Sequence, residues 1–281
     1  MRRILHWELV VRELERSISF YEALTPARAT AVVDSPGGRS ALLLDAGAST
    51  PHLRLVEPRR PVGLAHDSIG AIGFTRVVLH VADLAGTRAR AESLGLRPIA
   101  PTTGDDFAFD LGSRGRVGYR VWCCLDPDGI VVEFLEDPVP KVSTVAQGTA
   151  SLPTAVAFAR DELGLAVVDT VATPGPVPNV YLPGGAPVEF RGAFLRVPGE
   201  ERGYLDILEH TDPAVRRRAY DDDAHIGVIR CALEVDDLGA ARDAYVVDFG
   251  GPLGRRRVVD LLDPEGVRYR LVAPAEPALT R

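Results

Sequence analysis

The stretch RVVLHVADLAGTR (76–88) decides the fold, because a second copy, RCALEVDDLGAAR, occurs at 230–242. The two copies share arginine, leucine, valine, aspartate, leucine and arginine at identical spacing. Each is followed downstream by a tight turn, DPDG (126–129) or DPEG (263–266), and then by a short strand-like run. The repeated unit is therefore a strand, a helix and further strands.

Two fainter copies fill the rest of the chain. HWELVVRELERSISFYEAL (6–24) begins one copy and PHLRLVEP (51–58) ends it, while LPTAVAFARDELGL (152–165) and YLDILEHTDP (204–213) bracket the other. We therefore expect four modules, at about 4–57, 73–137, 142–210 and 227–273. The segment EDPVPKVSTVAQGTA (136–150) is the best candidate for a boundary, which gives two domains, 1–137 and 142–275.

Composition excludes several classes of function. The chain has 281 residues, of which 46% are hydrophobic and 25% charged, and its net charge is −7. Nucleic acid and anionic membranes need a basic surface, so neither is expected as a partner. No apolar run reaches the length of a membrane span, and the three cysteines form no C-x-x-C pair. We expect a cytoplasmic protein.

The residues now point to a known family. The pattern of HWELVVRELERSISFY (6–21), together with DPDGIVVEFLE (126–136), resembles the vicinal oxygen chelate superfamily, which includes glyoxalase I, bleomycin and fosfomycin resistance proteins and extradiol dioxygenases. The resemblance implies an α+β fold with four βαβββ modules, paired into two cupped eight-stranded mixed β-sheets with flanking helices. Modules one and two would form the first domain, and modules three and four the second.

The resemblance also implies which positions would bind a metal, namely a histidine that begins each module and a glutamate in its last strand. Carried over in module order, these positions hold His6 and Arg54, Arg76 and Glu133, Thr144 and Asp206, and Arg230 and Arg270. An arginine is always charged, and at about 4 Å it would repel a divalent cation by about 8 kcal/mol in a medium of dielectric constant near 20. We therefore expect no metal cofactor, and an ion pair between Arg76 and Glu133.

Strand alternation adds further side chains to the face that carries these positions. Glu8 would share this face with His6, His80 with Arg76, and His52 with Arg54. The predicted catalytic residues are His6, Glu133 and Arg76, and the predicted substrate-binding residues are Glu8, Arg54, His80, His52, Arg230 and Arg270. An ion pair that fills a disused metal site is the alternative interpretation of Arg76 and Glu133.

Three functions fit this site. The first is metal-independent proton transfer on a small carbonyl, aromatic or acidic metabolite, as in an isomerase, epimerase, cyclase or lyase. His6 or Glu133 would move the proton, while Arg76 and Arg54 would hold an enolate or carboxylate. The second is binding or sequestration of a small molecule without turnover. The third is a dioxygenase or glyoxalase whose divalent iron, manganese or zinc is held by His6, Glu133 and another histidine. The partner is a small molecule, and the chain would be a monomer or homodimer.

Overall fold

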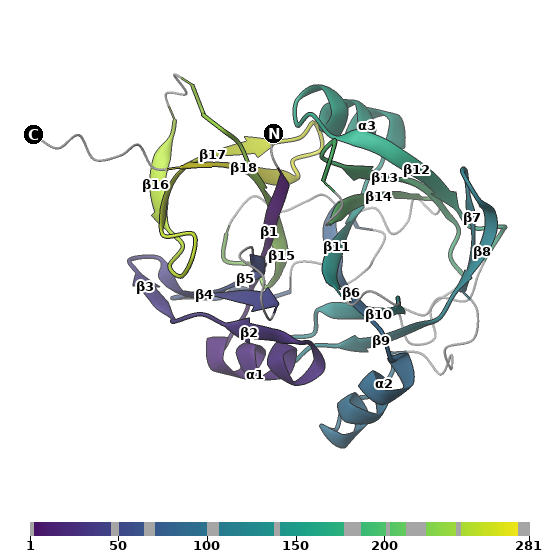
Figure 1. Cartoon of the computed structure of the whole chain (residues 1–281), viewed down its shortest axis with the longest axis horizontal. Coiled ribbons are helices and arrows are strands. Elements are labelled where there is room, and N and C mark those ends of the chain that lie inside the picture. The colour runs from purple at the N-terminus through teal and green to yellow at the C-terminus, as the bar shows by residue number, and fades with distance from the viewer. Residues whose placement is uncertain are drawn as a thin grey trace, which may run out of the picture.

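The structure, a computed structural model, describes residues 3–45, 51–64, 71–99, 107–137, 141–176, 187–200, 203–211, 223–239 and 243–274. Two curled β-sheets lie side by side, and each has nine strands instead of the expected eight (Figure 1). The helices that the described residues form are α1 (Leu14–Leu24), α2 (Leu84–Ser93) and α3 (Leu152–Asp161). The expected α+β class with cupped mixed sheets is confirmed.

Sheet 1 combines the first and the last modules of the chain. Its strand order is β16-β17-β18-β15-β1-β5-β4-β2, and β3 also pairs with β4. The strands from module one are β1 (Arg3–Val10), β2 (Ala27–Ala29), β3 (Val33–Ser35), β4 (Gly38–Asp45) and β5 (Pro51–Pro58). Those from module four are β15 (Gly227–Glu234), β16 (Tyr245–Asp248), β17 (Arg255–Leu262) and β18 (Arg268–Pro274).

Sheet 2 combines the two middle modules, in the order β8-β7-β12-β13-β14-β11-β6-β10-β9. The strands from module two are β6 (Gly73–Val81), β7 (Phe107–Leu111), β8 (Gly115–Tyr119), β9 (Val121–Leu125) and β10 (Val131–Glu136). Those from module three are β11 (Lys141–Gly148), β12 (Ala166–Ala172), β13 (Phe190–Arg196) and β14 (Tyr204–His210).

The pairing of modules differs from our expectation that neighbouring modules share a sheet in each half of the chain. The segment 136–150, expected as a boundary, contains the whole of β11, which is an inner strand of sheet 2. The connection between β10 and β11 is so short that module three must continue the sheet of module two. In sheet 1, Glu8 lies opposite Arg230 across β1 and β15, and opposite charges stabilise that pairing.

An extra hairpin, β7–β8, closes the open side of sheet 2. In the chain, the hairpin follows Ile99 and precedes β9. The N–H of Ile99 donates a hydrogen bond to Cys123 of β9, so the chain leaves from β9 and returns to it. It nevertheless pairs with β12 at the opposite edge of the sheet, where Val171 lies opposite Leu111. The hairpin therefore spans the gap between the two edges, at the far right of Figure 1. It converts the expected cup into a nearly closed barrel.

A shared apolar core joins the two sheets. Trp7 and Leu9 of β1 belong to the same buried cluster as Phe74, Val77 and Leu79 of β6. The rings of Trp7 and Phe74 lie edge to face, with centroids 5.7 Å apart. These residues alternate with polar ones along each strand, so one face of β1 and β6 enters this core while the other face lines its own sheet's interior.

The two proline-containing turns make hydrogen bonds across the sheets to the segments where α1 and α3 begin. In the DPDG turn next to sheet 2, the Asp128 carboxylate accepts hydrogen bonds from the Arg12 N–H (2.9 Å) and from the Arg16 guanidinium (2.6 Å) at the start of α1. In the DPEG turn next to sheet 1, Glu265 accepts from the N–H groups of Ala150 and Ser151 at the start of α3. Each turn therefore binds the segment just before a helix that belongs to the other sheet, and so it ties the two sheets together.

Candidate functional site

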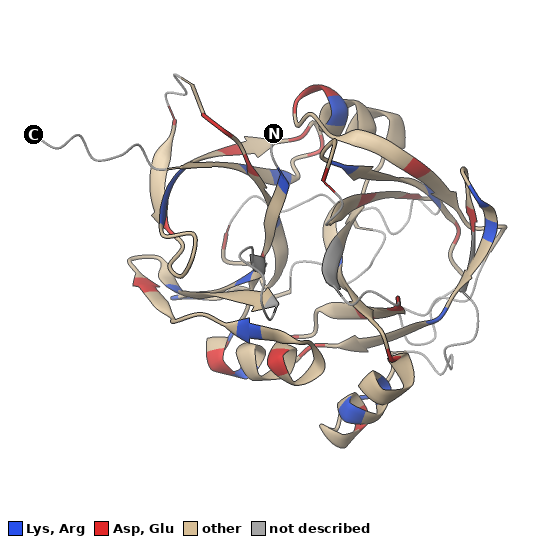
Figure 2. Ribbon diagram, viewed as in Figure 1, with Lys and Arg blue, Asp and Glu red and all other residues tan. Residues whose placement is uncertain are grey.

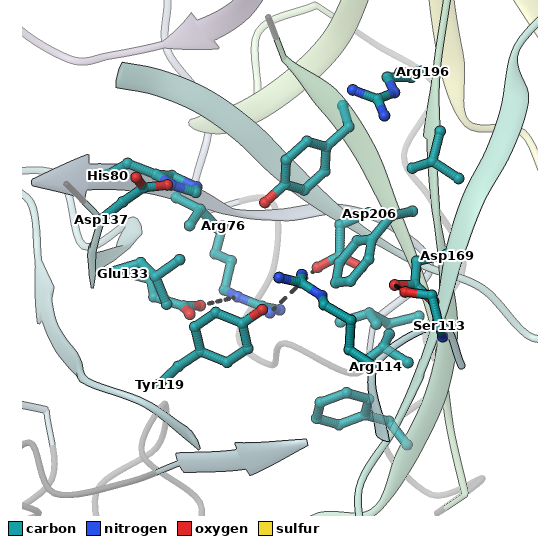
Figure 3. A pocket seen from close by; sticks show the side chains of 18 of the residues that line it. Arg76, His80, Ser113, Arg114, Tyr119, Glu133, Asp137, Asp169, Arg196 and Asp206 are labelled. Atoms are coloured by element: carbon teal, nitrogen blue, oxygen red, sulfur yellow. Dashed lines mark hydrogen bonds and ion pairs between the residues drawn. The ribbon is translucent and has the colours of Figure 1, made fainter. Parts of the chain in front are cut away.

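A cavity of about 610 Å³ lies inside sheet 2. It is lined by charged residues of β6, β10 and β14, by aromatic residues of β13, β14 and β8, and by the turn of the β7–β8 hairpin (Figure 3). This volume is typical of pockets for small organic ligands. The cavity is therefore the candidate site, and the sequence indicated only part of it.

Three charged side chains meet at the inner end of the cavity. Arg76 Nε donates to Glu133 Oε2 at 2.7 Å, which confirms the ion pair expected from the sequence. The second partner of Arg76 is Asp206, whose Oδ2 lies 3.9 Å from Arg76 Nη2. Asp206 comes from module three, so the cluster forms only because modules two and three share a sheet. The structure thus brings together two of our predicted catalytic residues with Asp206, which the resemblance had placed at a metal position of module three.

The Asp206 carboxyl group is unusual among these residues. Its Oδ1 is buried and has no hydrogen-bond partner among the described residues. Burial raises the pKa of Asp206 to about 7; Arg76 opposes the shift and Glu133 adds to it. A carboxyl group with such a pKa is present in both protonation states near neutral pH, as a general acid or base requires.

A histidine lies on the same face of the cavity wall. His80 of β6 is buried, and its Nδ1 lies 2.8 Å from Asp137 Oδ2, just beyond the end of β10. A carboxylate in this position fixes the orientation of the imidazole and favours the tautomer with hydrogen on Nδ1. His80 therefore faces the cavity as the sequence predicted, and its partner is Asp137.

The aromatic wall of the cavity was not predicted from the sequence. Phe190 and Phe194 of β13 face the cavity together with Tyr204 of β14 and Tyr119 of β8. The Phe194 and Tyr204 rings are 5.3 Å apart between centroids, at an angle of 67°. The alternation in FRGAFLR (190–196), which places Phe190, Phe194 and Arg196 on one face, is the signal that could have identified this wall.

The hairpin turn that closes the cavity was also missed. The backbone N–H of Ser113 donates to Asp169 Oδ1 at 2.9 Å, and the Ser113 hydroxyl group binds the same carboxylate. Gly112 permits this approach, since a Cβ there would lie 2.3 Å from Thr170 Oγ1. Arg114 follows in the turn and points into the cavity from the hairpin (Figure 3).

Five other predicted residues, His6, Glu8, Arg54, Arg230 and Arg270, lie in sheet 1, where Glu8 is the centre of an ion network. The buried Glu8 carboxylate accepts hydrogen bonds from Arg54 (2.9 Å), from Arg270 (2.8 Å) and from Arg230. Arg270 is in turn bound by Asp260 at 2.7 Å. Burial alone would raise the pKa of Glu8, but the three arginines hold it well below its usual range. Charged bands on the strands of this sheet are visible in Figure 2.

His6 lies beside this network but is poorly connected to it. Its Nε2 is 3.6 Å from Glu8 Oε1, and neither ring nitrogen has a hydrogen-bond partner among the described residues. Its ring packs edge to face on Phe249 at 5.3 Å, and the Arg54 guanidinium lies 4.7 Å from the centre of the same Phe249 ring. Burial lowers the pKa of His6, so the imidazole is neutral at pH 7.

The polar clusters predicted for the first and second halves of the chain are therefore wrong, because each sheet mixes residues from both halves. His6, Glu8, Arg54, Arg230 and Arg270 are in sheet 1, while Arg76, His80 and Glu133 are in sheet 2. The error follows from the pairing of the modules, because a cup is formed by whichever two modules share a sheet. His52 belongs to β5, but its side chain lies outside the described residues.

Comparisons with known proteins agree with this architecture. The family model described as Glyoxalase/Bleomycin resistance protein/Dioxygenase superfamily matches residues 3–134. Residues 3–134 of the chain belong to this superfamily. They contain modules one and two, which lie in different sheets. No curated protein matches the chain.

Solved structures of superfamily members resemble the whole chain. Glyoxalase I from Zea mays is 17% identical, with a TM-score of 0.66 over 97% of this chain and 92% of that one. A putative dioxygenase from Bacillus subtilis subsp. subtilis str. 168 is 13% identical, with a TM-score of 0.58 over 98% of this chain and 85% of that one. At such identities the likeness shows the fold alone. Among the described helices, none has the length and hydrophobicity needed to cross a membrane.

The superfamily's metal positions hold residues that do not fit a divalent ion. In sheet 1 these positions carry His6 and three arginines, which would repel a cation. In sheet 2 the Arg76 guanidinium lies between Glu133 and Asp206, and Thr144 is in β11 with its side chain outside the described residues. Among the described residues, no three His, Cys, Asp or Glu side chains form a group that could hold a metal. The alternative site that joins His6 to Glu133 is wrong, since they lie in different sheets.

Proposed function

We propose that this protein catalyses proton transfer on a small molecule bound inside sheet 2, without a metal. The observation that carries this proposal is the arrangement of Glu133, Arg76 and Asp206 at the inner end of the cavity, with Asp206 Oδ1 left free of hydrogen bonds among the described residues. An acid or base beside a fixed positive charge is what enolisation of a carbonyl compound requires.

Each residue of the cluster has a distinct role in this reaction. The Asp206 carboxylate accepts the proton of the carbon next to a carbonyl group, and the electron pair of that C–H bond moves to form the enolate. The Arg76 guanidinium stabilises the charge on the enolate oxygen, while Glu133 fixes the guanidinium through its bond to Nε. Return of the proton to another carbon, or to the other face, completes an isomerisation or epimerisation.

These roles revise the assignment made from the sequence. Asp206 takes the proton-transfer role expected of His6 or Glu133, since His6 is in the other sheet. Arg76 keeps its role as the stabilising cation. The pKa of Asp206, raised to about 7 by burial, supports the exchange of a proton near neutral pH.

A second candidate is binding without turnover, and the aromatic wall favours it. The Phe194 and Tyr204 rings could hold a planar ligand whether or not a proton moves. The same fold supports several activities, so only the residues of the site can distinguish catalysis from binding. In either case we propose a small-molecule partner, a cytoplasmic location and a chain that works as a monomer, with a homodimer as the alternative.

Deuterium exchange tests the proposal even when the product of the reaction is unidentified. Small ketones, aldehydes and 2-oxo acids are incubated with the protein in D₂O, and loss of the α-proton signal is followed by NMR. We expect exchange with at least one compound, a loss of at least about 100-fold in Asp206→Asn, and no change in Asp161→Asn, whose carboxylate is exposed on α3. Equal exchange in wild type and Asp206→Asn would refute the proposal.

Elemental analysis of protein purified without chelator tests the absence of metal. We expect less than about 0.1 equivalent of iron, manganese or zinc, and no loss of exchange after treatment with EDTA. One equivalent of metal, with activity that EDTA removes, would show that the third function considered from the sequence is the right one.

A further inference from the structure

Most carboxylates that line the sheet 2 cavity have a hydrogen-bonding or ionic partner. Glu133 is bound by Arg76, Asp137 lies beside His80, and the Glu136 carboxylate accepts from Arg120 at 2.8 Å. Asp169 is bound by Ser113. The wall carboxylates other than Asp206 therefore have partners, and Asp206 is partly protonated near pH 7 because burial raises its pKa.

Two cations of the same wall differ from these carboxylates. Arg114 and Arg196 both line the cavity, and neither forms an ion pair within 4 Å with a carboxylate of the described residues, although the Arg114 charge contributes to lowering the pKa of Asp169. Arg114 stands on the hairpin turn and Arg196 at the end of β13, so they approach the cavity from different elements (Figure 3). A guanidinium that faces a pocket in this way attracts an anion and binds a carboxylate through two parallel hydrogen bonds.

The register of β13 and β14 places Arg196 close to the reacting end of the site. Phe194 lies directly opposite Asp206, and Leu195 lies opposite Leu205. Arg196 is two residues beyond Phe194 on the same face of β13. It therefore lies diagonally across from Asp206 of β14. Diagonal neighbours in an antiparallel pair are roughly 7–8 Å apart. A ligand that touches both groups needs its anion a few bonds away from its reacting carbon.

The aromatic wall indicates the chemistry of the rest of such a ligand. The rings of Phe194 and Tyr204 stand between Arg196 and Asp206, 5.3 Å apart between centroids. A planar ring can pack on them while its acidic group reaches the arginines. The apolar residues Val78, Leu135 and Val171 form the remaining surface that such a ring would contact.

From these observations we infer that the ligand of the sheet 2 cavity is a small aromatic carboxylic acid. Its carboxylate is held by Arg196 and Arg114, its ring lies against Phe194 and Tyr204, and its reacting carbon faces Asp206. This inference rests on the proposed function for the role of Asp206. It adds the substrate class and two binding residues that the resemblance to the superfamily did not name.

Calorimetry with matched acids and amides tests the inference. The probes are benzoate, phenylacetate, 3-phenylpropanoate and phenylpyruvate, each compared with its neutral amide, and acetate as the acid without a ring. We expect at least one aromatic acid to bind at least about tenfold tighter than its amide and than acetate. Affinity for that acid should fall at least about tenfold in Arg196→Gln while affinity for the amide stays unchanged.

Arg191→Gln is the matched control, because it removes the same charge from the same strand. Arg191 is exposed and pairs with Glu209 at 3.1 Å, so this variant should bind the acid as wild type does. Equal binding of acids and amides, equal effects of the two variants, or no binding of any acid at 10 mM would each overturn the inference. The same titrations in Asp206→Asn separate it from the proposed function: acid binding without any proton exchange would refute the catalysis and leave the ligand class standing.

Discussion

Replacing the proposed catalytic residue Asp206 by asparagine should stabilise the protein at high pH. The folded state raises the pKa of Asp206 from its ordinary value of 3.8 to about 7, mainly because the group is buried. Between these two values the folded chain holds a proton that the unfolded chain has lost. The free energy of unfolding of the wild type therefore falls as the pH rises through this window.

The size of the effect follows from the shift. Each unit of pKa corresponds to 1.36 kcal/mol, so the ionised Asp206 costs the folded state about 4 kcal/mol at pH 8, of which about 3 kcal/mol develops between pH 5 and pH 8. Asparagine has nearly the same shape and no charge to bury. Asp206→Asn should therefore gain up to about 3 kcal/mol over wild type on going from pH 5 to pH 8.

Urea denaturation at several pH values measures this difference. Asp126 also has a pKa raised to about 7, chiefly by burial, but it is present in both proteins and cancels in the comparison. Asp161→Asn is the control, since the pKa of the exposed Asp161 is lowered by its bond to Arg160 and the variant should gain no stability as the pH rises. If the stability difference between Asp206→Asn and wild type did not change with pH, the reasoning about the buried carboxyl group would be wrong.

Three further predictions concern the rest of the molecule. Glu8→Gln leaves three guanidinium groups of sheet 1 without their shared carboxylate. It should lower the free energy of unfolding by about 3–5 kcal/mol in chemical denaturation, and a loss under about 1 kcal/mol would contradict the network. Asp128→Ala removes the bonds that join the DPDG turn to Arg12 and Arg16 and should cost about 2–3 kcal/mol while unfolding remains a single transition by both circular dichroism and fluorescence. Separate transitions would show that the sheets are independent. Burial raises the pKa of the Cys123 and Cys231 thiols and raises that of Cys124 to about 12. These cysteines should therefore react with Ellman's reagent only when the protein unfolds. Fast labelling of the native state would refute this prediction.

Much of the site could be predicted within single modules. The resemblance to the superfamily placed Arg76 and Glu133 at the two metal positions of one module, and the structure joins them at 2.7 Å. It placed His6 and Arg54 at the corresponding positions of another module, strand alternation added Glu8 beside His6, and Glu8 and Arg54 are 2.9 Å apart. Such predictions succeed because the side chains of a strand alternate strictly, and because the first and last strands of a module are neighbours in the sheet.

The partners across modules could not be predicted. Asp206 joins Arg76, and Arg230 joins Glu8, only through the pairing of module two with three and of module one with four. Each module has a similar first strand, so the sequence pattern allows more than one pairing. Arg114 could not be predicted for a different reason. It reaches the cavity from the β7–β8 hairpin, and the pairing of that hairpin with β12 depends on contacts between residues far apart in the chain.

The amino-acid sequence by itself determined the four modules, their strand faces and the arginines that stand where the superfamily places metal ligands. These features depend on local periodicity and on residue chemistry, which are fixed by neighbours along the chain. Only the tertiary structure decided that Glu8 is surrounded by three arginines in one sheet, and that Asp206 lies beside Arg76 at a cavity in the other. The physical reason is that the pKa of a buried charged group, and hence its protonation state, depends on the groups that surround it. Several of those groups come from another module.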